Sequence, residues 1–192
     1  MTGSKIYVFG YGSLMNLQSI QKTVSRRVAR EELQPAVLND FVRKWDLLEW
    51  IKFVDEPSAG IVPAVFLDVV RQLGRQTNGI LLSLTEDELT KMDGREKNYD
   101  RVNVSSLIAP RVGGDVFTYI GKEIHTRPTP EICVPADYEA LVLAGVHEWG
   151  VDFEAHFHQS TLPHNFPRRS GHYVFADPRQ SDLAGRPHQE GG

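Results

Sequence analysis

The stretch of sequence that decides the fold is Ile6-Tyr7-Val8-Phe9, which runs directly into Gly10-Tyr11-Gly12-Ser13-Leu14-Met15. Four consecutive β-branched or aromatic residues predict a buried strand, and two glycines that flank a tyrosine predict an abrupt turn after it. Because glycine tolerates unusual backbone angles and close approaches, the N–H groups of Gly12, Ser13 and Leu14 can converge on an anion or a carbonyl oxygen. The pattern fits a substrate-binding turn and equally an ordinary strand-to-helix turn.

Two better-known kinds of glycine turn do not fit this stretch. A dinucleotide-binding turn needs a third glycine near Met15, and a phosphate-binding loop needs Gly-Lys-Ser/Thr, which is absent. A nucleophile elbow needs glycines two residues before and after the serine, but Tyr11 and Met15 occupy those positions around Ser13. Ser13 is therefore not expected to be a nucleophile.

The composition is that of one globular domain with a small-molecule partner. The chain has 192 residues, 41% of them hydrophobic, and a formal net charge of −4 without a compensating basic cluster. That charge argues against nucleic acid and anionic membrane surfaces as partners. No secretory signal or membrane span is apparent, and the single cysteine, Cys133, excludes an internal disulfide. We therefore expect a cytoplasmic protein, whose oligomeric state the sequence leaves open.

Apolar spacing and turn residues predict the secondary structure. Helices are expected over Leu17 to Val24, from a capping box at Thr85 to a stop at Gly94, over Tyr138 to Trp149, and over Val151 to Gln159. Besides the first strand, strands are expected within 33–45 (two short ones or one bent one) and over 61–70, 78–84, 102–107 and 116–120. Strands joined mainly by loops predict an α+β domain over residues 1–176, with a small mixed sheet or barrel. Residues 177–192 are polar and turn-rich, so we expect a mobile tail.

The titratable residues offer one candidate for catalysis. His156 and His158, two apart on an expected helix, point in different directions and cannot share a metal, so no metal is expected. Glu96 follows the end of the helix that begins after Thr85, where exposed carbonyl groups raise a carboxyl pKa toward that of a general base. The alternative is a surface glutamate within one solvated group of charges, between Arg95 and Lys97.

Three segments taken together resemble the γ-glutamylcyclotransferase family, and they occur in the same order. They are Val8-Phe9-Gly10-Tyr11-Gly12-Ser13-Leu14, Met92-Asp93-Gly94-Arg95-Glu96-Lys97-Asn98-Tyr99 and Val116-Phe117-Thr118-Tyr119-Ile120-Gly121. Tyr-Gly-Ser-Leu and Arg-Glu-Lys look like the glutathione-degrading ChaC branch, but a tryptophan shortly after Leu14 is missing. The branch, ChaC-like or AIG2-like, stays open.

The resemblance implies a small mixed β-barrel flanked by helices and an enzyme that uses no metal or cofactor. It implies release of 5-oxoproline from a γ-glutamyl compound: glutathione, a γ-glutamyl amino acid or a γ-glutamyl amine. By the same resemblance, Tyr11, Gly12, Ser13 and Leu14 hold the γ-glutamyl group, Tyr119 contacts substrate and Glu96 is the general acid/base. A non-catalytic module on the same fold, binding a metabolite or a partner, is the alternative.

Overall fold

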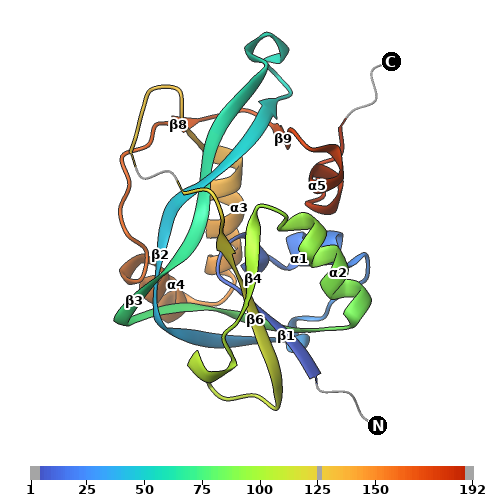
Figure 1. Cartoon of the computed structure of the whole chain (residues 1–192), viewed down its shortest axis with the longest axis vertical. Coiled ribbons are helices and arrows are strands. Elements are labelled where there is room, and N and C mark those ends of the chain that lie inside the picture. Colours follow the sequence, from blue (N-terminus) through green and yellow to red (C-terminus); the bar gives the residue numbers. More distant parts are fainter. Residues whose placement is uncertain (1–4, 125–126, 189–192) are drawn as a thin grey trace.

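A long antiparallel hairpin dominates the fold. The structure is a computed structural model, and it describes residues 5–124 and 127–188. The hairpin consists of β2 (Leu33–Phe53) and β3 (Ile61–Leu84), and it runs through the height of the molecule before bending sharply at its lower end (Figure 1). The register of the pair shifts between Asn39 and Phe41 and again between Trp45 and Leu47. Such bulges bend and twist a strand, so one continuous ribbon can curl around a core. The two strands predicted over 61–70 and 78–84 are therefore one.

The sheet curls strongly but does not close. Its order is β4-β6-β1-β3-β2-β5, and β9 adds to β2 beyond this path. The remaining strands are β1 (Lys5–Gly10), β4 (Tyr99–Asn103), β5 (Ile108–Ala109), β6 (Gly114–Gly121) and β9 (Tyr173–Phe175). β1 pairs antiparallel with β3 and parallel with β6, which makes the sheet mixed. The α+β prediction is confirmed, whereas the predicted barrel is a half-barrel, because no ladder joins β4 to β5 within the described residues.

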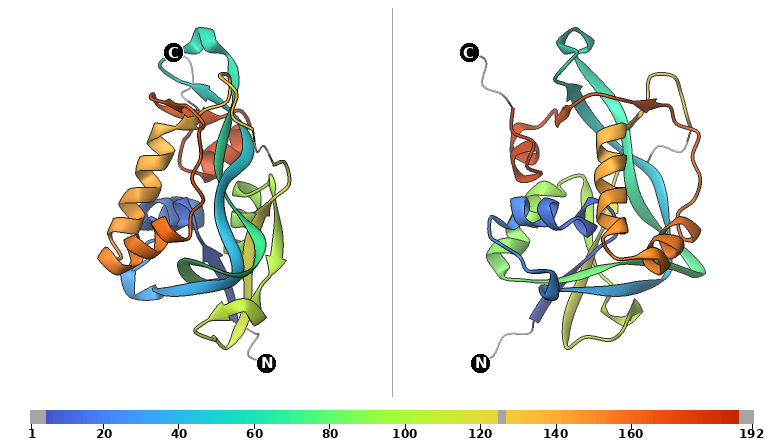
Figure 2. Two further views of the ribbon diagram at one scale, coloured as in Figure 1. Left: turned by 90° about the vertical axis from the view of Figure 1, so that its left-hand side faces the viewer. Right: turned by 180° about the vertical axis from the view of Figure 1, so that it is seen from behind.

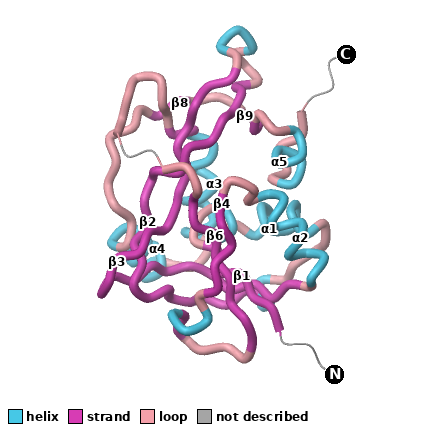
Figure 3. Tube along the Cα trace, in the orientation of Figure 1, coloured by secondary structure: helices cyan, strands magenta, loops and turns pink. Residues whose placement is uncertain are grey.

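Helices cover the sheet in two groups. They are α1 (Leu17–Val24), α2 (Glu86–Arg95), α3 (Ala136–His147), α4 (Val151–Gln159) and α5 (Pro178–Leu183). Figure 2 shows α3 and α4 on the side of the hairpin opposite to β4 and β6. The tube in Figure 3 shows α1, α2 and α5 gathered beside the strands, and α2 contacts both of its neighbours. A small second sheet pairs β7 (Val134–Pro135) with β8 (Arg168–Arg169).

The predicted capping box starts α2 as expected. The backbone N–H of Glu88 donates to the Thr85 hydroxyl at 3.2 Å, and the Glu88 carboxyl accepts from the N–H of Thr85 at 2.9 Å. The helix passes through Gly94, the expected stop, and Glu96 is its C-cap residue. The C-terminal end of α2 places Arg95 and Glu96 next to the turn that follows β1.

Residues 177–188, where the sequence led us to expect a mobile tail, contain α5 and its contacts. Asp177 caps α5 by accepting a hydrogen bond from the N–H of Gln180 at 2.8 Å, and the side chains of Gln180 and Ser181 are buried. The Ser181 hydroxyl accepts from the N–H of Phe175 at 3.1 Å. These are polar contacts, which a search for apolar periodicity does not detect. The packed chain extends to 188, and the last part of the predicted tail, 189–192, lies outside the described residues.

Within the described ranges, no helix is long and apolar enough to cross a membrane.

Candidate active site

The glycine turn after β1 is held in place by a buried arginine. The Nε atom of Arg43 donates to the carbonyl oxygen of Tyr11 at 2.8 Å. The other nitrogens of Arg43 donate to oxygens of Asn78, Phe157, Ser160 and Thr161. Burial lowers the pKa of Arg43 to about 9, because its partners are neutral oxygens and not a carboxylate. The turn is thus tied to β2, β3 and the end of α4.

The glycines of the turn serve close packing. A Cβ atom at Gly10 would lie 2.6 Å from the Cβ of Leu14, and one at Gly12 would lie 3.0 Å from the Tyr138 hydroxyl. Gly12 has φ −126°, so close approach, and not positive φ, explains the residue type. Among the described residues, no acceptor is hydrogen-bonded to the N–H groups of Gly12, Ser13 or Leu14. These donors are available to a ligand.

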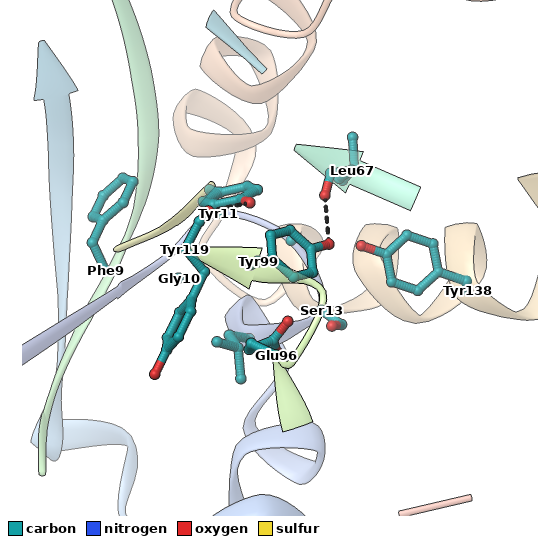
Figure 4. Close-up of a pocket in the computed structure, with 11 residues that line it drawn as sticks. Phe9, Gly10, Tyr11, Ser13, Leu67, Glu96, Tyr99, Tyr119 and Tyr138 are labelled. Carbon is teal, nitrogen blue, oxygen red and sulfur yellow. Dashed lines mark hydrogen bonds between the residues drawn. The ribbon is translucent and has the colours of Figure 1, made fainter. Parts of the chain in front are cut away.

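One pocket brings all six predicted site residues together (Figure 4). Its lining comprises Phe9, Gly10, Tyr11, Gly12, Ser13, Leu14, Leu67, Glu96, Tyr99, Tyr119 and Tyr138. The turn after β1 is far in sequence from Glu96, which follows α2. The curled sheet brings the two together at this pocket.

Glu96 is a shielded acid at this pocket. Its side chain is 14% exposed, and its Oε1 atom lies 2.9 Å from Nε of Arg95. Burial raises the pKa of Glu96, and the charge and hydrogen bond of Arg95 oppose that rise. The direction agrees with the expectation from sequence, but desolvation is the main cause instead of the helix terminus.

Arg95 is a site residue that the sequence analysis missed. It is 6% exposed and donates to the Ser13 hydroxyl at 2.9 Å and to the Ser19 hydroxyl at 3.0 Å, besides its contact with Glu96. Lys97, in contrast, is exposed and pairs with Asp177 at 2.7 Å. The idea that residues 95–97 form one solvated group of charges is therefore wrong. Residues 95–97 are all charged, so their sequence did not indicate that Lys97 is exposed while Arg95 and Glu96 are shielded.

Three of the four tyrosine hydroxyls at the pocket donate hydrogen bonds within the protein. Tyr11 donates to the carbonyl oxygen of Tyr119 at 2.7 Å, and Tyr119 donates to the Asp93 carboxyl at 2.8 Å. Tyr99 donates to the carbonyl oxygen of Leu67 at 3.0 Å. Figure 4 shows the hydroxyls of Tyr99 and Tyr138 facing each other, whereas that of Tyr119 points away from them. Tyr11 and Tyr119 thus present their rings to the pocket, not free hydroxyls.

Phe9, Tyr99 and Tyr138 are wall residues that sequence reasoning did not assign. In the sequence, Phe9 belongs to a strand pattern, Tyr99 to a family motif and Tyr138 to an apolar helix face. None of these patterns distinguishes a residue of a pocket wall from a residue of the core. Cys133 is buried elsewhere, and burial raises the pKa of its thiol. Within the described residues, no group of three or more His, Cys, Asp or Glu is arranged to hold a metal. The polar side chains that line the pocket are those of Glu96, Ser13 and the tyrosines.

No family model and no curated protein matches the chain. Solved structures do. One described as a gamma-glutamyl cyclotransferase has a TM-score of 0.59 at 14% identity, over 95% of this chain and 99% of that one. A gamma-glutamyl cyclotransferase specific to glutathione from yeast has a TM-score of 0.54 at 14% identity, over 82% and 96%. YkqA from Bacillus subtilis has a TM-score of 0.55 at 20% identity, and the match spans 86% of this chain but 56% of YkqA. The chain has the fold of these proteins.

Proposed function

We propose that this protein is a γ-glutamylcyclotransferase that releases 5-oxoproline from a small γ-glutamyl compound in the cytoplasm, with Glu96 as general acid/base. One observation carries the proposal. Glu96, a shielded carboxyl of raised pKa, lines the same pocket as the unoccupied N–H groups of the turn. A proton acceptor and a set of oxyanion donors are the two parts that this reaction needs.

The first step is removal of a proton from the substrate. The α-amino group of a γ-glutamyl compound has a reference pKa of about 8, so at neutral pH it is mostly protonated and cannot attack. Glu96 accepts that proton, and the free amine then attacks the γ-carbonyl carbon of the same molecule. A C–N bond forms, and the carbonyl oxygen gains negative charge. The N–H groups of Gly12, Ser13 and Leu14 are proposed to stabilise that charge.

The second step is departure of the leaving amine. The original γ-amide C–N bond breaks, the carbonyl re-forms, and Glu96 returns the first proton to the leaving nitrogen. The attacking nitrogen, which still carries two hydrogens after bond formation, gives up one of them, and the departing amine takes up this second proton. The products are 5-oxoproline and the protonated amine, so atoms and charge balance without water. Because well-oriented intramolecular reactions reach effective molarities of about 10⁵ to 10⁸ M, folding the substrate correctly supplies much of the rate. No serine or cysteine nucleophile is required.

A binding module on the same fold is the competing proposal. The Arg95–Glu96 ion pair favours it, because pairing with a cation lowers the basicity of a carboxylate. Activity decides between the two. Purified protein is incubated with glutathione, γ-glutamyl dipeptides and γ-glutamyl amines, and 5-oxoproline is measured. Turnover of any of these substrates supports the enzyme.

Glu96→Gln is the matching variant, because it keeps the size of the side chain and cannot accept a proton. We expect it to fold, to bind substrate and to lose about 10² to 10⁴-fold in kcat. Glu31→Gln, an exposed glutamate outside the pocket, removes the same charge and serves as control. Equal kcat values in the Glu96 and Glu31 variants would assign Glu96 to binding or stability and favour the module.

A further inference from the structure

A second lobe lies beside the proposed active site. It shares Ser13, Glu96, Tyr99 and Tyr138 with the first pocket. Beyond them it is lined by Glu49 on β2, Phe66 on β3, Phe175 on β9, Gln180 on α5, and Arg95. The reaction proposed above does not use these additional residues, apart from the contact of Arg95 with Glu96.

Glu49 is the unusual member of this lobe. It is 2% exposed, and its two carboxyl oxygens accept hydrogen bonds from neutral amides, those of Asn98 and of Gln180, the latter at 3.0 Å. Within the described ranges, no Lys, Arg or His forms an ion pair with it. Burial raises the pKa of Glu49 to about 7, the two amides oppose that rise, the Glu96 carboxylate adds to it, and the charge of Lys97 lowers it. A buried carboxylate without an ion-pair partner is costly unless a ligand supplies the positive charge.

Arg95, the cationic side chain that lines the lobe, is not free to fill that role. Each of the three guanidinium nitrogens of Arg95 already contacts an oxygen, of Glu96, Ser13, Ser19 or Thr23. The charges of Arg95 and Glu96 offset each other, and Lys97, whose charge also acts on Glu49, is paired with Asp177. An ionised Glu49 therefore has no ion-pair partner of its own within the described residues. The lobe is therefore suited to a monocation.

The remaining walls suit an alkylammonium group. Phe66 packs against Tyr138 with ring centroids 4.6 Å apart and against Phe175 at 5.5 Å. Aromatic rings attract cations through their faces and accept methylene groups by burial of apolar area. An acid at one wall and aromatic rings beside it match a short methylene chain that ends in an ammonium.

We propose that the second lobe receives the departing amine, and that Glu49 selects substrates whose amine carries a second, positively charged nitrogen. This inference rests on the proposed function. During cyclisation the glutamyl part of the substrate lies against Glu96 and the turn after β1. The γ-amide bond to the departing amine then points out of the forming lactam ring, toward the second lobe, which shares Glu96 with the first pocket. The preferred substrates are γ-glutamyl amides of alkyl diamines. Glutathione would instead bring a terminal carboxylate toward Glu49, and two like charges repel.

The test compares three γ-glutamyl amides that differ in the charge of the departing amine. They are the amides of 1,3-diaminopropane (cationic end), butylamine (neutral end) and β-alanine (anionic end). In the wild type we expect kcat/KM for the cationic substrate to exceed that for the neutral one by about tenfold or more, with the anionic substrate slowest. In Glu49→Gln the preference for the cationic over the neutral substrate should fall to about threefold or less, whereas Glu31→Gln should keep it.

The outcomes separate the two proposals. Equal wild-type kcat/KM values, or a preference for the anionic end, overturn the role of Glu49 and leave the proposed function standing; this arm holds even if Glu49→Gln does not fold. A cationic preference that survives in folded Glu49→Gln also overturns it. If no substrate gives 5-oxoproline, the proposed function fails. Calorimetry with 1,3-diaminopropane alone then tests the lobe, since wild type must bind it more tightly than Glu49→Gln does.

Discussion

At the scale of single residues, two neighbours in sequence have opposite fates. Arg95 is buried against α1 and the glycine turn, while Lys97 lies on the surface. Arg95 contacts both Ser13 and Glu96, so it connects the backbone donors to the proposed base. We regard Arg95 as a positioning residue that also sets the pKa of Glu96.

The pH dependence of activity follows from the pKa of Glu96. Burial raises this pKa above 4.5, so Glu96 takes up a proton as pH falls through the raised value, and the base form is lost. Wild-type kcat/KM should therefore decline on the acid side. Arg95 lowers the pKa of Glu96, so Arg95→Met should raise it further and move the acid limb of the profile to higher pH.

Lys97→Met is the matched control, because it removes one positive charge two positions after Arg95. Its acid limb should coincide with that of wild type. A purely structural role of Arg95 would lower activity at every pH without moving the limb, and that result would contradict the assignment.

At the scale of elements, the turn after β1 works through its shape. A methyl group at Gly12 would meet the Tyr138 hydroxyl at 3.0 Å, so Gly12→Ala should displace the turn and its N–H groups. We expect a roughly tenfold to hundredfold loss in kcat/KM, measured as 5-oxoproline release. Ser13→Ala should be milder, because Arg95 keeps the Ser19 hydroxyl as an acceptor.

A double-mutant cycle identifies the cause of that loss. Tyr138→Phe removes the hydroxyl that the new methyl group meets, so the loss caused by Gly12→Ala should be smaller in the Tyr138→Phe background. The same loss in both backgrounds would show that the contact with Tyr138 is not the reason for glycine at this position.

At the scale of the whole molecule, the C-terminal segment completes the folded unit. α5 packs against α2 and β9, and Gln180 donates to Glu49 across the second lobe. Deleting residues 177–192 should lower the melting temperature, by roughly 2 to 4 °C for each kcal/mol of stability lost. It should also weaken any preference for cationic substrates. A chain that ends at His188 is the control, and equal melting temperatures for the two truncations would contradict this role of α5.

Local rules determined much of this protein from its sequence. The helices Leu17–Val24 and Val151–Gln159 have the predicted bounds, and the capping box at Thr85 starts α2 as predicted. The first strand and the turn after it were also predicted, whereas Glu96 as general base stays a prediction. Capping and amphipathic spacing involve residues within a few positions of one another, so a single sequence displays them.

Only the tertiary structure decided which charges are buried and which segments form the pocket. Arg95 meets Ser13 across 82 positions, and Gln180 meets Glu49 across 131. The bulges that curl β2 and β3 into a half-barrel bring these distant residues together. Burial then sets the protonation of Glu96 and Glu49, because desolvation depends on everything packed around a carboxyl and not on its neighbours in sequence.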